Sequence, residues 1–538
     1  MGPGLPGQPV AAEESEAGLL RSSASISLIT AAARVAGFAR WIVLGATVGA
    51  TYLGNTYQTA NWVPNILFEL AAGGVLTAVF VPTFVAELEH GRERGTEVAA
   101  SIANGLLLLS LPLVAGAIIF GRPIMRGLTV GVADPAVRAA EIELGAWFLR
   151  FFAPQIPLYL LGMVMTGILH AHRKFVAPAA APLFSSLVVI ATYLVFHSMG
   201  PRADIGTATR EQLYVLAGGT TAGVVALTFS QLPSVLRLGI RWRPVLRLRD
   251  PSVRRAMRAG GWGMAFFAVT QAGLLVTLIL ANRVRGGVVA YQVGYALFML
   301  PVALIGLPVA ISLYPSMSRS IVRRDEQGYA RVLSLGWRTT ALLAAPAAAG
   351  LAVLARPLAQ ALETAGAART GSALVAAASG ALALGLPAYA LNEILARAFY
   401  ARRQTAPPVA VNAVAIGLYA FAACTITAVA RPRGADAVAV MGWAHSAGQW
   451  AGVAVGVLLL ARSARVWRPA GDLVSTAASA ARAAVMAACV WLVVHALRAV
   501  PPAPRVAAGV LAGAAVFGVA CLFSRDARLA MSGIRNRR

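Results

Sequence analysis

Residues 168–178 read ILHAHRKFVAP, and residues 398–408 read AFYARRQTAPP. In both stretches an alanine precedes a basic pair, and a proline follows seven residues after the alanine. A second pair, Gly73–Pro82 and Gly306–Pro315, matches at nearly the same offset of about 230 residues. Chance similarity between alanine-rich helices is the alternative, but two matches at one offset favour two homologous halves. The equivalent positions of the first pair are Ala171 and Ala401, and Pro178 and Pro408.

The composition around these matches is typical of a membrane protein. Of the 538 residues, 58% are apolar and only 12% are charged, and the mean hydropathy is +0.71. A soluble domain carries about twice that share of charged residues. The apolar content excludes a disordered chain, and the three cysteines, all in apolar stretches, exclude a disulfide scaffold. We therefore predict an all-α polytopic membrane protein.

Hydrophobic runs of about 20 residues, long enough to cross a bilayer, occur about fourteen times. Six spans in each half would give two lobes of the same orientation, because six is an even number. Two spans remain at the C-terminal end. The predicted spans are 25–49, 57–86, 98–121, 141–168, 177–198, 212–235, 259–281, 288–316, 332–354, 372–399, 407–429, 437–461, 477–499 and 505–523.

These spans divide the chain into six predicted parts. The beginning of the chain lacks a basic stretch followed by an apolar core, so we expect no cleavable signal peptide. The parts are a disordered cytoplasmic tail (1–21), an N-terminal six-helix lobe (22–236), an arginine-rich cytoplasmic linker (237–258), a C-terminal six-helix lobe (259–462), two additional helices (463–524) and a basic cytoplasmic tail (525–538).

The arginines indicate how the chain is oriented. A net charge of +25 would suggest nucleic acid as a partner of a soluble chain. Here the arginines cluster in loops that follow even-numbered spans, and eight of them lie in 237–258. The mixed acidic and basic loop after the second span does not follow this pattern. By the positive-inside rule both termini are cytoplasmic, and we expect no nucleic-acid partner.

Polar side chains line one face of the second predicted span. Gln58, Asn61, Asn65 and Glu69 follow one another at helical spacing, and Asn55 extends the stripe outward. Lipid would not accept this stripe, so it must face protein or a water-filled cavity. A hydrogen-bonded packing seam is the alternative, but the ionisable Glu69 favours a cavity.

Three arginines are candidate ligands for a substrate anion. Arg34 lies about ten residues into the first span, where snorkelling to the interface is difficult, whereas Arg40 could reach the outer interface more easily. Two guanidinium groups aimed inward would bind phosphate oxygens, with Glu69 as a resting counter-ion. Arg283, at the outer end of the seventh span, is a further candidate, although an interface anchor would explain it equally.

Motifs of soluble catalysis are missing from the sequence. It contains no GxxxxGK[ST] phosphate loop, no HExxH zinc motif and no GxSxG nucleophile elbow. Prolines interrupt several spans, which is common in transporters that bend and rock. We therefore predict a transporter rather than an enzyme, with no catalytic residues, no cofactor and no metal site.

Several of these stretches resemble the motifs of a known family. Ala33–Arg40 and Trp62–Gly74 resemble the first- and second-helix motifs of the MurJ/MviN lipid II flippases, in the multidrug/oligosaccharidyl-lipid/polysaccharide exporter superfamily. Phe80–Pro82 and the two repeated loops also match, and the resemblance covers most of 22–460. It implies a fourteen-helix, two-lobed fold with a central cationic cavity. It further implies that Arg34 and Arg40 engage a pyrophosphate, and that the last two helices form a groove for a polyprenyl tail.

The chain also departs from this family. Many relatives carry a basic pair at Phe68 and Glu69, an acid at Asn55 and an arginine near Ala296. Near Thr277 some carry an acid that contributes to cation binding. The pattern from Glu69 to Gly74 is similar to that of actinobacterial members.

The resemblance implies a flippase that moves an undecaprenyl-pyrophosphate-linked peptidoglycan precursor, lipid II, from the inner to the outer leaflet by alternating access. It implies the bacterial cytoplasmic membrane as the location, lipid and cell-wall synthesis or division proteins as partners, and membrane potential or an ion gradient as the driving force. The alternatives are a flippase for another polyprenyl-linked glycan, a drug antiporter of the same superfamily, and a non-transporting scaffold of cell-wall assembly. A membrane-embedded glycosyltransferase or phosphatase is a further alternative.

Overall fold

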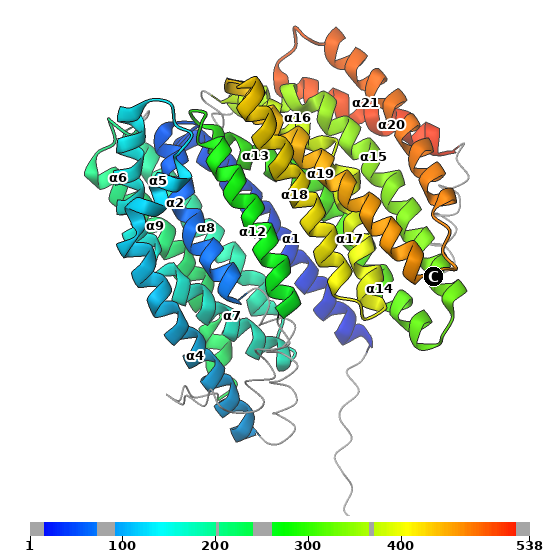
Figure 1. The fold of residues 1–538 in the computed structure, drawn as a ribbon, viewed down its shortest axis with the longest axis horizontal. Helices are drawn as coiled ribbons and strands as arrows, with labels where there is room; N and C mark the ends of the chain where they lie inside the picture. The colour runs from blue at the N-terminus through cyan, green and yellow to red at the C-terminus, as the bar shows by residue number, and fades with distance from the viewer. Residues whose placement is uncertain (1–15, 73–91, 201–203, 240–260, 365–370, 523–538) are drawn as a thin grey trace, which may run out of the picture.

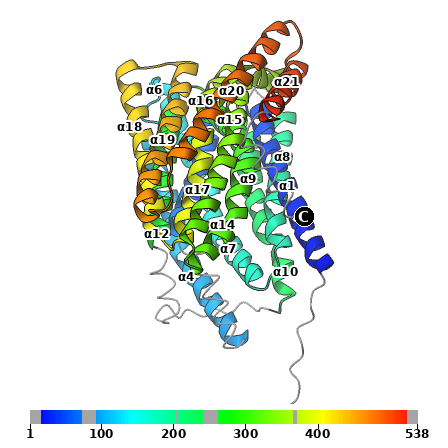
Figure 2. The same cartoon turned by 90° about the vertical axis from the view of Figure 1, so that its right-hand side faces the viewer.

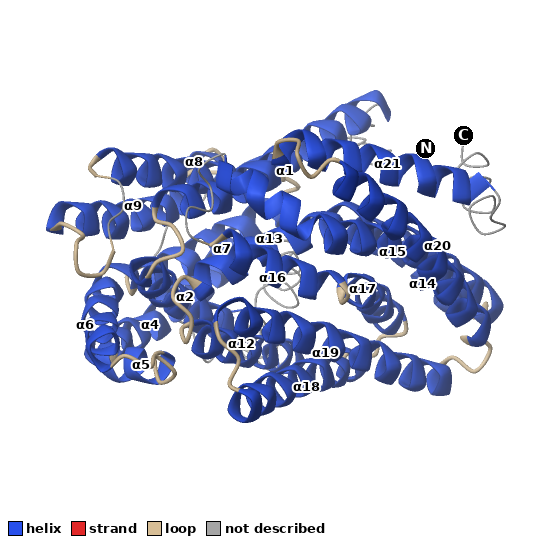
Figure 3. Ribbon diagram, turned by 90° about the horizontal axis from the view of Figure 1, so that it is seen from above, coloured by secondary structure: helices blue, strands red, loops and turns tan. Residues whose placement is uncertain are grey.

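The computed structural model describes residues 16–72, 92–200, 204–239, 261–364 and 371–522. Every regular element within these ranges is a helix (Figures 1 and 3). The first half contains α1 (Glu16–Thr47), α2 (Tyr52–Ala72), α4 (Arg92–Ile119), α5 (Gly121–Leu128), α6 (Pro135–Phe152), α7 (Gln155–Ala171), α8 (Val176–Ser198), α9 (Arg210–Phe229) and α10 (Leu232–Leu236). The second contains α12 (Gly261–Ala281), α13 (Gly287–Pro301), the π-helix η2 (Val302–Gly306), α14 (Leu307–Val322), α15 (Glu326–Thr364), α16 (Ser372–Ala383), α17 (Leu386–Ala401), α18 (Ala406–Ala430), α19 (Gly434–Ser463), α20 (Ala470–Ala496) and α21 (Pro502–Leu522).

The membrane-spanning character of the fold is confirmed, but the predicted count of fourteen spans is not. Eleven described helices are long and apolar enough to cross a membrane, and two bent pairs, α4–α5 and α16–α17, raise the number to thirteen. The second predicted span corresponds to α2, a 21-residue helix that is not among them. Its polar stripe lowers its mean hydropathy.

Some predicted parts can be compared only partly with the structure. α1 begins at Glu16, so the end of the 1–21 segment, expected to be disordered, is helical. The rest of that tail, the Gly73–Pro82 match, most of the arginine-rich linker and the basic tail lie outside the described residues.

The internal repeat appears in the way the helices pack. In the first half α8 packs on α9 and α1, α2 packs on α6, and α4 packs on α7. In the second half α18 packs on α19 and α12, α13 on α16, and α15 on α17. The two halves meet where α2 contacts α12 and α13 and where α1 contacts α13. Helices at equivalent places in the repeat therefore occupy equivalent places in the fold.

The two repeated loops fold into the same turn. α7 ends at Ala171 and α17 ends at Ala401, and each helix is followed by an arginine in the left-handed conformation, Arg173 (φ 55°) and Arg403 (φ 59°). The amide after each arginine donates to a carbonyl in the last turn of the helix, as in a Schellman motif. These bonds run from Lys174 N to Leu169 O (2.8 Å) and from Gln404 N to Phe399 O (3.0 Å).

Breaks in the helices also recur. α6 and α7 are separated by Ala153 and Pro154, and α16 and α17 by Leu384 and Gly385, where the bend is 48°. Between α13 and α14 the chain forms η2, which lies between two prolines. Proline lacks the N–H of a regular α-helical bond, so such sites kink or widen the helix.

The last two helices, α20 and α21, pack together and against the long helix α15 (Figures 1 and 2). The Asp472 carboxylate, 1% exposed, lies at the start of this contact. It accepts hydrogen bonds from Ser334 Oγ (2.7 Å), Arg338 Nε (2.7 Å) and Trp467 Nε1 (2.9 Å). A buried carboxylate satisfied in this way fixes α20 to α15.

Candidate functional site

Four of the predicted site residues line one cavity in the first half of the chain. Arg40 of α1 and Gln58, Asn61 and Asn65 of α2 surround a space of about 80 Å³. The opposite wall comes from α7, α8 and α9. It consists of Tyr159, Ser185, Val189, Tyr193, Thr220 and Val224, and Trp41 and Trp62 complete the lining.

The polar atoms of this cavity are partly unpaired. Gln58 Oε1, Asn61 Oδ1 and Trp62 Nε1 are buried and have no hydrogen-bond partner among the described residues. The Arg40 guanidinium lies 5.3 Å from the ring centre of Trp41, and no described carboxylate pairs with it. In a low-dielectric interior the Arg40 guanidinium and the Trp62 Nε1 donor would attract the oxygens of a phosphate-like anion, whereas the two unpaired amide oxygens accept and need a donor.

Asn55 has a different position although it belongs to the same stripe. Its Nδ2 donates to Val284 O (2.8 Å), and its Oδ1 accepts from Val288 N (3.0 Å). The side chain is fully buried. It therefore ties α2 to the turn between α12 and α13, which joins the two halves of the molecule.

The structure places Arg34, Glu69 and Arg283 outside this cavity. Arg34 is exposed, and its Nη1 donates to Ala303 O of η2 (3.1 Å), so it connects α1 to the second half. Glu69 is half-buried and pairs with neither Arg34 nor Arg40 among the described residues. Arg283 is exposed, and its side chain packs over Gly131.

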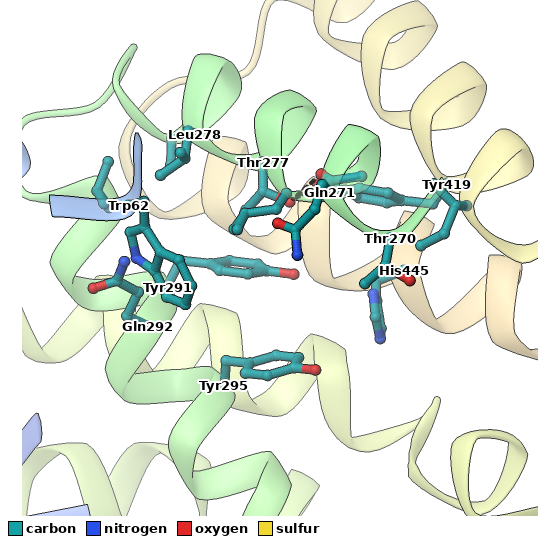
Figure 4. Close-up of a pocket in the computed structure, with 15 residues that line it drawn as sticks. Trp62, Thr270, Gln271, Thr277, Leu278, Tyr291, Gln292, Tyr295, Tyr419 and His445 are labelled. Carbon is teal, nitrogen blue, oxygen red and sulfur yellow. Dashed lines mark hydrogen bonds between the residues drawn. The ribbon is translucent and has the colours of Figure 1, made fainter. Parts of the chain in front are cut away.

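A second polar cavity measures about 270 Å³ and lies between α2, α12, α13, α18 and α19 (Figure 4). We call it the larger cavity, because of the two polar cavities it exceeds the one around Arg40. Its polar lining is uncharged. Trp62 and Gln292 lie at one end and Tyr419 and His445 at the other, with Gln271 extending into the middle. Thr277 and Tyr419, which both line this cavity, share a hydrogen bond of 2.6 Å.

The two cavities occupy equivalent places in the repeat. Arg40, Asn61 and Asn65 of the smaller cavity correspond, at the offset of 230, to lining residues of the larger one. The corresponding residues are Thr270, Tyr291 and Tyr295. The scaffold has thus produced two hollows, one with a guanidinium and one with tyrosines and amides.

A third hollow is almost entirely apolar. It measures about 420 Å³ and lies where α13 and α15 face α20 and α21. One wall of this hollow consists of Leu297, Leu300 and Pro301 at the end of α13. The next residues of the chain form η2, where Ala303 O accepts the hydrogen bond from Arg34 of α1. The lining of the hollow suits a hydrocarbon chain and offers little to a polar headgroup.

A comparison with protein families identifies the chain. The model described as Lipid II flippase MurJ matches residues 44–500, which is most of the sequence. The chain belongs to the MurJ lipid II flippase family.

Individual relatives agree with this assignment. The chain is 30% identical over 414 residues to the "Lipid II flippase MurJ" of Burkholderia cenocepacia, covering 74% of this chain and 76% of the relative. It is 27% identical over 458 residues to the "Probable lipid II flippase MurJ" of Rhizobium tropici, covering 84% and 82%.

Solved structures agree on the fold. The chain is similar to a MurJ lipid II flippase in an inward closed conformation, with a TM-score of 0.76, 19% identity, and coverage of 93% of this chain and 99% of that one. It is also similar to an inward-facing multidrug resistance MATE family transporter of the MOP superfamily, with a TM-score of 0.61, 14% identity, and coverage of 81% and 95%. The predicted fold class and family are therefore confirmed.

Sequence reasoning missed two groups of cavity residues. Tyr159 and Tyr193 face Arg40 from α7 and α8, and tyrosines in apolar helices carry no special signal. Gln271, Gln292 and His445 of the larger cavity were not singled out either. Within the described ranges, no group of three or more His, Cys, Asp or Glu is placed to hold a metal ion.

Proposed function

We propose that this chain moves lipid II from the inner to the outer leaflet of the bacterial cytoplasmic membrane by alternating access. The observation that carries the proposal is the guanidinium of Arg40 in a polar cavity inside a bundle of membrane-spanning helices. A charged group at the centre of a bilayer costs at least about 2.5–3.5 kcal/mol, and an anion site would explain why this bundle keeps a guanidinium in its interior.

In this proposal Arg40 binds the pyrophosphate, and the amides of Asn61 and Asn65 replace its water. The Arg40 guanidinium is available to the substrate, because no carboxylate among the described residues forms an ion pair with it. Pyrophosphate oxygens match the planar fork of arginine. A single strong contact also allows release, since a site with many arginines would hold the anion in both states.

The polyprenyl tail stays in the apolar hollow between α13, α15, α20 and α21. The bond from Arg34 Nη1 to Ala303 O connects α1 to η2, which directly follows the α13 wall of this hollow. We propose that α1 and η2 part to admit the headgroup while the tail remains in contact with lipid. The π-helical stretch and its two prolines would make this the most deformable part of the wall.

The finer topology belongs to the same proposal. The lobes comprise 22–236 and 259–462, joined by the linker 237–258, and both termini are cytoplasmic. Rocking of the lobes exposes the cavity to either side, driven by membrane potential or an ion gradient. The role is transport without covalent chemistry, and cell-wall synthesis or division proteins are the expected partners.

The test is translocation of labelled lipid II in proteoliposomes. Arg40→Ala and Arg34→Ala should each slow translocation, and Glu69→Gln should show whether a carboxylate is needed. The matched control is Arg122→Ala, because Arg122 forms an exposed ion pair with Glu143 and such pairs contribute little. Equal protein levels are required. Unchanged rates in both Arg34 and Arg40 variants would contradict the site.

A further inference from the structure

The larger cavity holds several buried polar atoms without partners. Gln271 Oε1, Gln292 Oε1 and Nε2, and His445 Nε2 make no hydrogen bond among the described residues, and Trp62 Nε1 makes none either. Gln271 is 8% exposed and His445 is 9% exposed. An unpaired buried polar group costs about 1–3 kcal/mol, so several around one space require a ligand or ordered water.

The chemistry of the lining selects a neutral ligand. None of the lining residues is Asp, Glu, Lys or Arg. The unpaired atoms include donors (Trp62 Nε1 and Gln292 Nε2) and acceptors (Gln271 Oε1 and Gln292 Oε1). Hydroxyl and acetamido groups are both donors and acceptors, whereas a phosphate only accepts and would leave the acceptors unsatisfied.

Aromatic rings provide flat apolar surfaces beside these polar atoms. Tyr291 and Tyr295 lie nearly parallel, 16° apart with ring centres separated by 6.4 Å. His445 meets the ring of Tyr295 edge-on at 6.1 Å, and Tyr419 closes the far end (Figure 4). Pockets that combine apolar aromatic faces with a few directed polar groups suit a ring with C–H faces and an equatorial rim of polar substituents.

From these observations we propose that the larger cavity is a saccharide site that receives one sugar ring of the substrate. The inference rests on the proposed function, because it assigns part of the same headgroup. A volume of about 270 Å³ holds about nine waters at ~30 Å³ each, enough for a single ring and too little for a disaccharide with a peptide. Trp62 lines both this cavity and the one containing Arg40, so a sugar and its attached pyrophosphate can occupy neighbouring sites.

The test compares two lipids that differ by one sugar, with the full chain in nanodiscs. The probes are undecaprenyl pyrophosphate and undecaprenyl pyrophosphate bearing one N-acetylated amino sugar without peptide. The wild type should bind the sugar-bearing lipid more tightly. Gln271→Leu and Gln292→Leu should each weaken its binding about tenfold, the loss of one or two hydrogen bonds, and leave the bare lipid unaffected.

A matched control and a stability measurement complete the experiment. Gln404 Oε1 is also buried without a partner, but Gln404 lies in the turn after α17 and lines neither cavity, so Gln404→Leu should bind both lipids as the wild type does. Because the Gln292 side-chain amide makes no hydrogen bond to the described residues, Gln292→Leu should keep or raise the thermal midpoint, which separates lost binding from lost folding.

The outcomes are distinguishable. Equal wild-type affinity for the two lipids, or equal loss of both lipids in the glutamine variants, overturns the saccharide site. If lipid II is nevertheless translocated, the proposed function stands and the cavity holds water only. If the wild type neither translocates lipid II nor binds either probe, both proposals fail.

Discussion

The cavity around Arg40 and the cavity around Tyr291 have the same origin and different chemistry. Equivalent helices build their walls, since α1, α2 and α8 of the first cavity correspond to α12, α13 and α18 of the second. Where the first has Arg40, Asn61 and Asn65, the second has uncharged or aromatic residues. The difference teaches that the repeat supplies the hollow and that a few side chains decide what each hollow accepts.

The difference also has an energetic reason. A guanidinium inside a membrane protein is costly, and a second one in the other half would double that cost and hold an anion more firmly. Tyrosines and glutamines avoid the charge and still offer hydrogen bonds to a ligand. Dividing the two chemistries between two adjacent cavities suits a substrate whose own charged and neutral parts are adjacent.

The largest expected effect comes from moving the charge between the cavities. In the double variant Arg40→Thr, Thr270→Arg, the guanidinium occupies the equivalent position of the other half. We expect lipid II translocation to remain as low as in Arg40→Thr alone, about 10- to 100-fold below the wild type, because a charge-assisted contact of about 1.5–3 kcal/mol is lost. Proteoliposome assays measure this. Recovery in the double variant would mean that the two cavities are interchangeable.

Much of the first cavity could be predicted from the sequence. Gln58, Asn61 and Asn65 share a face because their spacing is helical, and that face could not point at lipid. The same reasoning could not tell Asn55 from its neighbours. Spacing determines which way a side chain points, but the partner of Asn55 comes from a turn more than 200 residues away.

The second cavity could have been predicted by combining the polar stripe of 55–69 with the offset of the internal repeat. Adding the repeat offset to Asn61 and Asn65 leads to Tyr291 and Tyr295. Tyrosine in an apolar helix gives no signal alone, so only this projection indicates a site. The position of Arg34 could not be predicted in this way, because its partner, Ala303 O, belongs to the second half of the chain.

A smaller effect, on stability, should separate the structural and binding parts of the α2 stripe. Asn55→Leu leaves Val288 N without a partner in a buried interface and removes one of the two hydrogen bonds to Val284 O, which still accepts from Gly287 N (2.8 Å). We expect a loss of about 2–3 kcal/mol. Asn412→Leu is the control. Asn412 also makes two hydrogen bonds, to Phe266 O and Thr270 Oγ1, but in a less buried place within the second half, so its loss should be about 1 kcal/mol or less. Thermal unfolding in detergent measures both, and equal losses would mean that Asn55 has no special role between the halves.

The smallest effect tests whether the two repeated turns are as alike as they look. Arg173 and Arg403 are both exposed, and both have positive φ in a Schellman turn. A non-glycine residue pays about 1 kcal/mol for this conformation, so Arg173→Gly and Arg403→Gly should each stabilise the protein by up to about that amount. The two shifts in thermal midpoint should be similar, because each turn makes the same pair of backbone hydrogen bonds. Opposite shifts would show that one arginine makes contacts that the other lacks, and that the two turns are not equivalent.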